Sequence, residues 1–214
     1  MSEKQCMKSE LEKMIIGEIY NQADLCIVLK MAKAHLLVTK LNKISMLRQR
    51  KRTRILRKLL GFLGGEPYFV ASPIYIQYGC NTKIGKNFVS NYNFVLMDAA
   101  PVHIGDDVMI APNVTITTEL HPMHHEERKV HWTPHKLPSS NRGDYEYTRP
   151  VSIGNNVWLC ANVTVCPGVN IGENSVIGAG SVVTHDIPAN VLAVGNPCRA
   201  VREISEADRM NISK

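Results

Sequence analysis

A six-residue repeat between residues 153 and 188 constrains the fold of this chain more than any other feature of its sequence. Aliphatic side chains recur at every sixth position without a gap, at Ile153, Leu159, Val165, Ile171, Ile177 and Val183. The fourth place of each hexad holds a residue type that tolerates a left-handed backbone, namely Asn156, Asn162, Gly168, Asn174, Gly180 and Asp186. Each hexad therefore predicts one short strand followed by one corner.

This period of six fits neither an amphipathic helix nor a β-hairpin meander, but it fits a solenoid in which each hexad forms one side of a coil. Three sides close one turn, so a coil takes about 18 residues. Ile153 should then lie over Ile171, and Leu159 over Ile177. Stacked coils are parallel strands roughly 4.8 Å apart, with the aliphatic side chains filling the interior. The sequence predicts a mainly β protein built as a parallel solenoid.

An earlier run of the six-residue step passes through Ile104, Ile110 and Ile116 and then breaks off until about residue 150. The interrupting segment is polar, rich in proline and histidine, and has no period. Inside a solenoid such an interruption maps to a loop on one face, often the binding face. The expected parts are a helical N-terminal segment at 1–66, a solenoid at 67–200 with an excursion loop at 117–150, and a C-terminal tail at 201–214.

Apolar side chains in the first 63 residues follow a helical period. A first stripe comprises Leu11, Met14, Ile15 and Ile19. Asp24 is a suitable N-cap for a second helix. The expected apolar stripe of that helix is Leu25, Val28, Leu29, Ala32, Leu36 and Leu41. A third helix is expected from Leu47 to Leu63, where Gly64 and Gly65 end it.

The third helical segment carries a basic run at 48–58, within the sequence RQRKRTRILRKLL. Such a run can bind nucleic acid, but no aromatic side chains interleave with the charges here. We interpret it as a solvated helix face. The net charge of +6 suits an anionic ligand or a nucleic acid and does not choose between them.

The composition and the N-terminal sequence indicate in which cellular compartment the protein is expected. No apolar run approaches the roughly 18 to 20 residues of a membrane span, and the polar start MSEKQCMKSE is unlike a signal peptide. The six cysteines show no CxxC spacing, so free thiols in a reducing compartment are expected. We expect a cytoplasmic protein with no membrane partner.

Several motifs resemble those of one enzyme family. They are GEIY near the N-terminus, IGDDVMIAPNV, HPMHHEER, IGNNVW, PGVNIGENSVIGAGSVV and VGNPCR. Together they resemble the galactoside, maltose and related sugar O-acetyltransferases of the hexapeptide-repeat family, from about Leu11 to Ile204 except for much of the excursion. The resemblance implies a left-handed parallel β-helix, against the usual right-handed rule for parallel crossovers. It also implies a homotrimer with active sites between subunits, and acetyl-CoA as co-substrate with no metal required.

In the resembled enzymes the first histidine of the H-P-x-H-H motif is the general base, and His121 holds that place. Chemistry agrees independently, because a sugar hydroxyl is a poor nucleophile near pH 7. An imidazole titrating near 6.5 can accept its proton during attack on the acetyl thioester. We interpret His124 and His125 as loop or structural residues, and Glu126 as a candidate for orienting an imidazole.

Acceptor contacts are expected from three residues. Asn91 matches a family asparagine in the active site, and Tyr78 and Asp98 lie where further contacts are expected. Carboxylate and amide groups hold ring hydroxyls by paired hydrogen bonds. The chain departs from the galactoside pattern at two acceptor-side aspartates, where it has Gln22 and Ala99, and this leaves the acceptor open.

Acetyl-CoA contacts are implied by resemblance at the groove positions Ala161, Ala179, Thr184, His185, Arg199 and Arg202. Small residues at the corners let the pantetheine arm lie along the stacked coils, and the arginines supply charge for the CoA phosphates. His185 replaces the usual lysine and Ala161 a serine. Trp158, next to the groove, is interpreted as a core or interface residue.

Other functions remain open. The acceptor could be a streptogramin antibiotic or an oligosaccharide, with the long insertion at 131–147 accounting for the difference. A γ-type carbonic anhydrase would hold zinc with histidines from neighbouring subunits, drawn from His103, His121, His124 and His125. Against it, the characteristic histidine pair spaced five apart is absent. A non-catalytic scaffold is the third alternative, since hexads alone specify only a tube.

Overall fold

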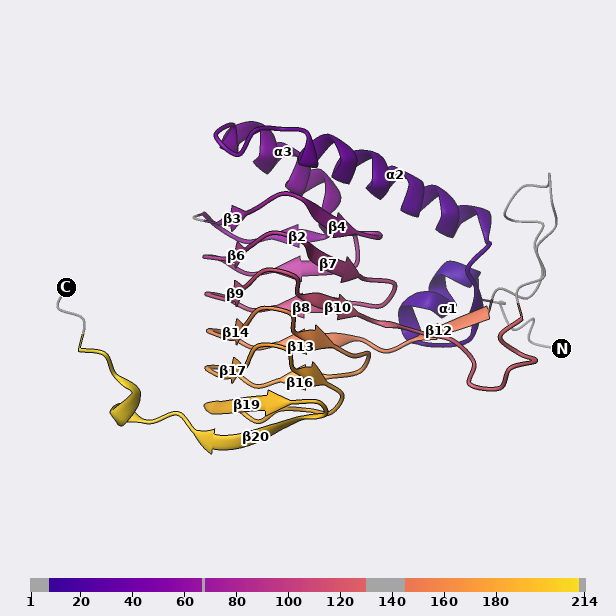
Figure 1. Cartoon of the computed structure of the whole chain (residues 1–214). Helices are drawn as coiled ribbons and strands as arrows, with labels where there is room; N and C mark the ends of the chain where they lie inside the picture. The colour runs from indigo at the N-terminus through magenta and orange to yellow at the C-terminus, as the bar shows by residue number, and fades with distance from the viewer. Residues whose placement is uncertain (1–7, 67, 130–144, 212–214) are drawn as a thin grey trace, which may run out of the picture.

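The computed structural model describes residues 8–66, 68–129 and 145–211. The chain forms a left-handed parallel β-helix whose coils stack from β2–β4 at the N-terminal end to β19 at the C-terminal end (Figure 1). Helices α2 and α3 lie across the N-terminal end of the stack. The expected fold class is confirmed.

Three sheets form the three sides of the solenoid. Sheet I contains β2 (Phe62–Leu63), β5 (Thr82–Ile84), β8 (Val102–Ile104), β13 (Val151–Ile153) and β16 (Asn170–Ile171). Sheet II contains β3 (Phe69–Val70), β6 (Val89–Ser90), β9 (Met109–Ile110), β14 (Trp158–Leu159), β17 (Val176–Ile177), β19 (Val191–Gly195) and β20 (Cys198–Glu203). Sheet III contains β4 (Ile74–Ile76), β7 (Phe94–Met97), β10 (Thr115–Thr117), β15 (Thr164–Val165) and β18 (Val182–Val183). All neighbours pair in parallel except β19 and β20, which are antiparallel.

The stacking register is the one that the 18-residue spacing predicts. Ile153 pairs with Ile171 and Leu159 with Ile177. The aliphatic side chains of the hexads point inward and are at most 3% exposed. One continuous apolar core therefore runs through the tube.

The residue at the fourth place of the hexad has a left-handed backbone, as predicted, in five of the six hexads from residue 153 onward. Asn156 and Asn162 have φ values of 57° and 61°. The asparagine side chains also bond between coils, since Asn156 Nδ2 donates to Asn174 Oδ1 over 3.0 Å. The prediction is wrong at Asp186, which has no left-handed φ. Its carboxylate instead accepts a hydrogen bond from the backbone N–H of Asn170 at 2.7 Å.

The N-terminal helices differ from the expected ones in their limits. Helix α1 (Glu10–Ile16) begins at a capping box formed by Ser9 and Glu12, and it ends at Gly17 before Ile19 is reached. The cap predicted for α2 (Leu25–Asn42) is confirmed, because Asp24 accepts hydrogen bonds from the second and third residues of that helix. Helix α3 (Gln49–Leu59) ends before the predicted Leu63. The two residues Phe62–Leu63 form β2 of sheet I instead.

The buried face of α2 is not the predicted one. Its buried residues are Ile27, Ala34, Val38 and Leu41, and only Leu41 was in the expected stripe. Leu25, Leu29 and Leu36 are exposed. The sequence pattern was ambiguous because this helix is apolar on more than one side.

The basic run is a solvated face except at one residue. Its other arginines and lysines are exposed, whereas Arg52 is 1% exposed. Arg52 Nη1 donates to the carbonyl oxygens of Leu41 and Ile44, and Nη2 donates to Val70 O and Ser72 Oγ. This buried guanidinium joins α2, α3 and the first coil.

The chain ends in β20 and the short 3₁₀ helix η2 (Glu206–Asp208). The solenoid extends beyond its expected range of 67–200 at both ends, because β2 begins before it and β20 ends after it. In the described part of the chain, Cys26, Cys80, Cys160, Cys166 and Cys198 are free thiols, as expected. No helix among the described residues is long and apolar enough to cross a membrane.

Candidate active site

The excursion loop leaves and rejoins the solenoid through two strands. Strand β11 (Glu119–Leu120) follows sheet III, and β12 (Tyr145–Thr148) leads back to sheet I. They pair with each other and with β1 (Tyr20–Asn21) in a three-stranded antiparallel sheet of order β1-β12-β11. The N-terminal segment therefore packs directly on the excursion (Figure 1). The insertion 131–147 lies mostly outside the described residues, as do His131 and His135.

His121 follows β11 directly, and its side chain is 53% exposed. Its Nε2 atom lies 3.6 Å from Oε1 of Glu146, a carboxylate on β12. His124 and His125 are exposed and stack on each other with ring centroids 4.7 Å apart. Glu126, the predicted orienting carboxylate, pairs with His125 and Lys129. The carboxylate that faces His121 is Glu146.

A buried polar cluster lies behind His121. Glu146 is 3% exposed and accepts a 2.5 Å hydrogen bond from the hydroxyl of Tyr20. Burial, reinforced by the nearby charge of Glu146, raises the pKa of Glu119 to about 8. Burial also raises the pKa of Tyr20 and of Tyr78 well above the ordinary phenol value. Sequence reasoning missed Tyr20, Glu119 and Glu146. No sequence pattern relates Tyr20 to Glu146, which lies 126 positions later in the chain.

Asp98 and Tyr78 are held together by backbone hydrogen bonds. Asp98 is fully buried, and its Oδ1 accepts from the backbone N–H groups of Tyr78 and Gly79, both at 2.9 Å. Its Oδ2 accepts from Thr82 Oγ1. Burial raises the pKa of Asp98, and these hydrogen bonds oppose the rise. Asp98 thus fixes the backbone at Tyr78 rather than presenting free oxygens.

Three buried polar atoms near this cluster have no hydrogen-bond partner among the described residues. They are the Tyr78 hydroxyl, Gln77 Oε1 and Glu119 Oε1. Buried polar atoms are normally satisfied, so unsatisfied ones call for an explanation such as a bound polar group. Ala99, at one of the departures from the galactoside pattern, is fully buried and packs with Tyr20 and Tyr78. The departure therefore lies at this cluster.

The other predicted site residues lie at different edges of the solenoid. Asn91 follows β6, and Ala161 and Ala179 follow β14 and β17, so all three lie where sheet II turns into sheet III. The carbonyl of Ala161 accepts from the N–H of Gly180, so this edge stacks coil on coil. His121 leaves from the opposite edge of sheet III. Within one chain, Asn91 and His121 are not brought together.

The remaining predicted donor contacts lie at the C-terminal end. Thr184 and His185 follow β18, at the same edge of sheet III that His121 leaves. Arg199 Nη1 lies 3.4 Å from Nδ1 of His185. Arg202 forms two hydrogen bonds with Asp208, at 2.7 and 2.9 Å. These bonds hold the pKa of Asp208 down to about 2.

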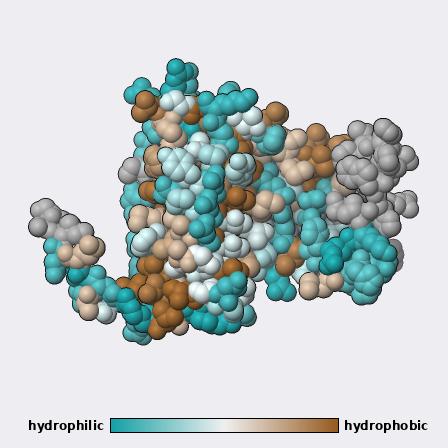
Figure 2. Space-filling view, in the orientation of Figure 1, coloured by the Kyte–Doolittle hydropathy of each residue, from teal (hydrophilic) through white to brown (hydrophobic). Residues whose placement is uncertain are grey.

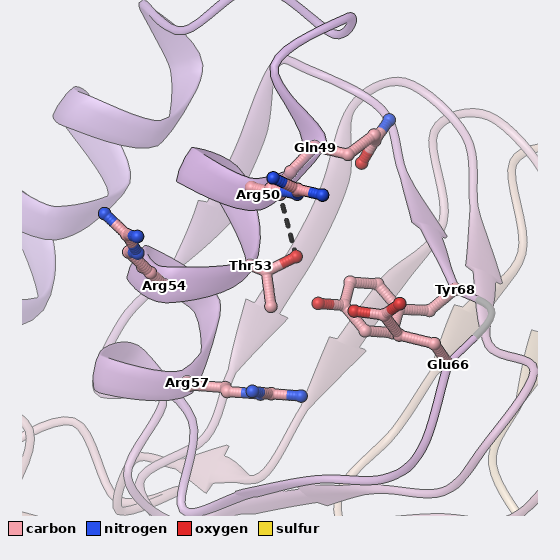
Figure 3. A pocket seen from close by; sticks show the side chains of 7 residues that line it. All are labelled: Gln49, Arg50, Thr53, Arg54, Arg57, Glu66 and Tyr68. Atoms are coloured by element: carbon pink, nitrogen blue, oxygen red, sulfur yellow. Dashed lines mark hydrogen bonds between the residues drawn. The ribbon is translucent and has the colours of Figure 1, made fainter.

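A separate hollow of about 390 Å³ lies between α3 and the chain leading into β3. Figure 3 shows the side chains of Arg57 and Thr53 on one side of it and Glu66 and Tyr68 on the other, while Arg54 points away. None of its lining residues belongs to the predicted site. The hollow is formed by part of the basic run, at the N-terminal end of the solenoid.

The described residues contain no group of three or more His, Cys, Asp and Glu side chains that could hold a metal ion. His103, one of the histidines considered for zinc, lies in β8 on the exposed face of sheet I, in register with Lys83 and Ser152. His121 lies on the excursion. A single chain therefore does not bring His103 and His121 close together.

Two family models match the chain. "Bacterial transferase hexapeptide (six repeats)" matches residues 150–185, and "Maltose acetyltransferase hexapeptide capping motif" matches residues 13–65. The galactoside O-acetyltransferase of Escherichia coli K12 is 46% identical over 159 residues, which are 74% of this chain and 71% of that protein.

Solved structures agree with these matches. A maltose O-acetyltransferase from Clostridium difficile 630 has a TM-score of 0.83 at 41% identity, covering 93% of this chain and 99% of that one. A galactoside acetyltransferase in complex with coenzyme A has a TM-score of 0.85 at 38% identity, covering 97% of both chains. Fold and likenesses define an acetyl-CoA-dependent O-acetyltransferase built on hexapeptide repeats. The chain belongs to the maltose and galactoside O-acetyltransferase family, which confirms the resemblance.

Proposed function

We propose that the protein transfers the acetyl group of acetyl-CoA to a hydroxyl of a sugar or sugar-like acceptor, with His121 as the general base. The observation that carries this is the position of His121, half exposed on the excursion with a buried carboxylate behind it. A general base of this kind contributes typically about 100-fold to 10,000-fold to the rate.

The reaction proceeds by direct transfer. The acceptor oxygen attacks the thioester carbonyl carbon while the imidazole of His121 takes the hydroxyl proton. The tetrahedral intermediate then breaks its C–S bond, and the CoA sulfur leaves and takes the proton from the imidazolium. The products are the acetyl ester and the CoA thiol, and His121 is neutral again.

We also propose a homotrimer with each site between two subunits. Asn91, Ala161 and Ala179 lie at one edge of sheet III, and His121, Thr184 and His185 at the other. Packing the two edges of neighbouring subunits together would complete both the acceptor site and the acetyl-CoA groove.

The outer face of sheet II supports such packing. Six apolar residues stand in register on it, one per coil, namely Phe69, Val89, Met109, Trp158, Val176 and Leu192. Phe69, Met109 and Trp158 are 38–49% exposed. Figure 2 shows a further hydrophobic patch over β19 and β20, where Val194 and Val201 are exposed. Exposed apolar surface of this extent is typical of an interaction site.

The acceptor is inferred only as a hydroxyl-bearing sugar or sugar-like molecule, from the galactoside and maltose O-acetyltransferases to which the chain is similar. Thiol release from acetyl-CoA, measured over glucose, maltose, galactosides, amino sugars, oligosaccharides and streptogramins, identifies it.

The test of the base is the His121→Ala enzyme, with His125→Ala as the matched control. Both histidines are exposed and lie four residues apart. We expect His121→Ala to lose at least 100-fold in kcat while it keeps the fold and oligomeric state, and His125→Ala to stay within twofold of wild type. A folded His121→Ala enzyme with wild-type activity would refute the assignment.

A further inference from the structure

Beyond the base itself, we propose that Glu146 is a positioning residue for His121, held in place by the hydroxyl of Tyr20. In this arrangement the N-terminal segment, which carries Tyr20 on β1, forms part of the catalytic centre. The inference rests on the proposed function, because it assigns the residues that orient the proposed base.

The geometry forms a short chain of polar contacts. Tyr20 Oη donates to Glu146 Oε2 at 2.5 Å, and the other oxygen, Oε1, lies 3.6 Å from Nε2 of His121. A carboxylate next to one imidazole nitrogen fixes the orientation and tautomer of the ring. With Nε2 facing Glu146, Nδ1 is the nitrogen that accepts the acceptor proton. Glu146 then stabilises the imidazolium that forms during attack.

Strand pairing fixes this chain of contacts. Tyr20 pairs with Glu146 across β1 and β12, and Leu120, next to His121, pairs with Tyr147 across β11 and β12. Thr148 Oγ1 donates to the carbonyl of Met14 at the end of α1 over 2.6 Å. Since Glu146 is almost fully buried, its carboxylate is held by the sheet rather than by solvent.

The charge of the cluster favours one ionised carboxylate. Among the described residues, the titratable groups that act on Glu146 include Glu119 on β11, Tyr20 on β1, Tyr78 on the solenoid and His121 itself. Two carboxylates that share a buried site do not both ionise readily. Glu119, whose pKa is raised to about 8, therefore carries a proton at neutral pH, and the Tyr20 hydroxyl donates to the carboxylate of Glu146. The carboxylate that accepts from Tyr20 is thus also the one that faces His121.

The test uses Glu146→Gln, which keeps the size of the side chain and removes its charge. We expect kcat to fall about tenfold to 100-fold while KM for acetyl-CoA stays within about twofold, because an interaction made only as charge develops is lost. Glu146→Asp should recover part of kcat. Glu126→Gln is the matched control, since Glu126 is an exposed carboxylate that pairs with His125, and its kcat should not change.

Tyr20→Phe gives an independent measurement. It should lower kcat about threefold to tenfold in the wild-type background and have no further effect in a Glu146→Gln background, because Tyr20 acts through Glu146. A folded Glu146→Gln enzyme with wild-type kcat overturns the proposal, and so do additive effects of the two substitutions.

Different results would contradict the positioning role of Glu146 and the proposed function of the protein. If Glu146→Gln does not fold, Tyr20→Phe alone decides, and an unchanged kcat overturns the positioning role. If His121→Ala is inactive while Glu146→Gln is normal, the base assignment stands and only the positioning role fails. If His121→Ala retains full activity, the proposed function itself fails.

Discussion

Arg52 Nη2 donates to the carbonyl oxygen of Val70 over 2.7 Å, and this bond ties helix α3 to the first coil of the solenoid. The same guanidinium donates to Leu41 and Ile44 at the end of α2. Burial lowers the pKa of Arg52, yet its planar fork satisfies several buried carbonyl oxygens at once. The N-terminal helices are thereby fixed to the open end of the tube, where the apolar core would otherwise meet water.

We predict that Arg52→Lys destabilises the protein by about 2 to 4 kcal/mol. The ammonium of lysine cannot donate at once to the carbonyl oxygens of Leu41, Ile44 and Val70, so buried oxygens lose their donors. Urea unfolding followed by circular dichroism measures the free energy of unfolding. Arg54→Lys, at an exposed position of the same helix, is the control and should change that free energy by less than about 0.5 kcal/mol. Equal effects of the two substitutions would contradict the assignment.

The hexads predicted the solenoid because each of its contacts repeats a local rule. An aliphatic residue that points inward and an asparagine at a left-handed corner are both visible within six residues. Arg52 belongs to a charged run and looks like its solvated neighbours, so its burial depends on a contact with Val70 that no local rule contains. The same holds for the candidate site. His121 is visible through its motif, whereas Glu146 and Tyr20 become neighbours only through the pairing of β1 with β12.

The glycines at the second hexad place test the spacing of the coils. A Cβ atom built on Gly154 would lie 2.6 Å from the backbone nitrogen of Glu173 on the next coil. Because a backbone atom cannot move aside without separating the coils, Gly154→Ala should destabilise the protein by about 2 to 3 kcal/mol. Thermal unfolding measures this. Gly65→Ala is the control, since nothing lies within 4 Å of its added Cβ atom. A Gly154→Ala variant with the thermal stability of wild type would show that the coils tolerate wider spacing.

The buried carboxyl of Glu119 predicts a pH dependence of stability. Its folded pKa of about 8 exceeds the ordinary value of 4.5, so its stabilising contribution is complete below about pH 4.5 and is lost as pH rises through about 8. Glu119→Gln removes this loss. The free energy of unfolding of the variant, minus that of wild type, should therefore increase by about 2 to 4 kcal/mol from pH 5 to pH 8.5. Urea unfolding at pH 5, 7 and 8.5 measures the difference, and parallel stability curves would show that Glu119 ionises normally.

The two arginines proposed for the CoA phosphates should not contribute equally. Arg202 already gives two hydrogen bonds to Asp208, whereas no carboxylate among the described residues is paired with Arg199. We therefore predict that Arg199→Gln raises KM for acetyl-CoA about tenfold to 100-fold, the effect of losing one hydrogen bond to a charged group. Arg202→Gln should change KM by less than about twofold. Steady-state kinetics at saturating acceptor measure both values. If Arg202→Gln raises KM as much as Arg199→Gln, then Arg202 exchanges Asp208 for the co-substrate on binding, and Asp208→Asn should lower KM.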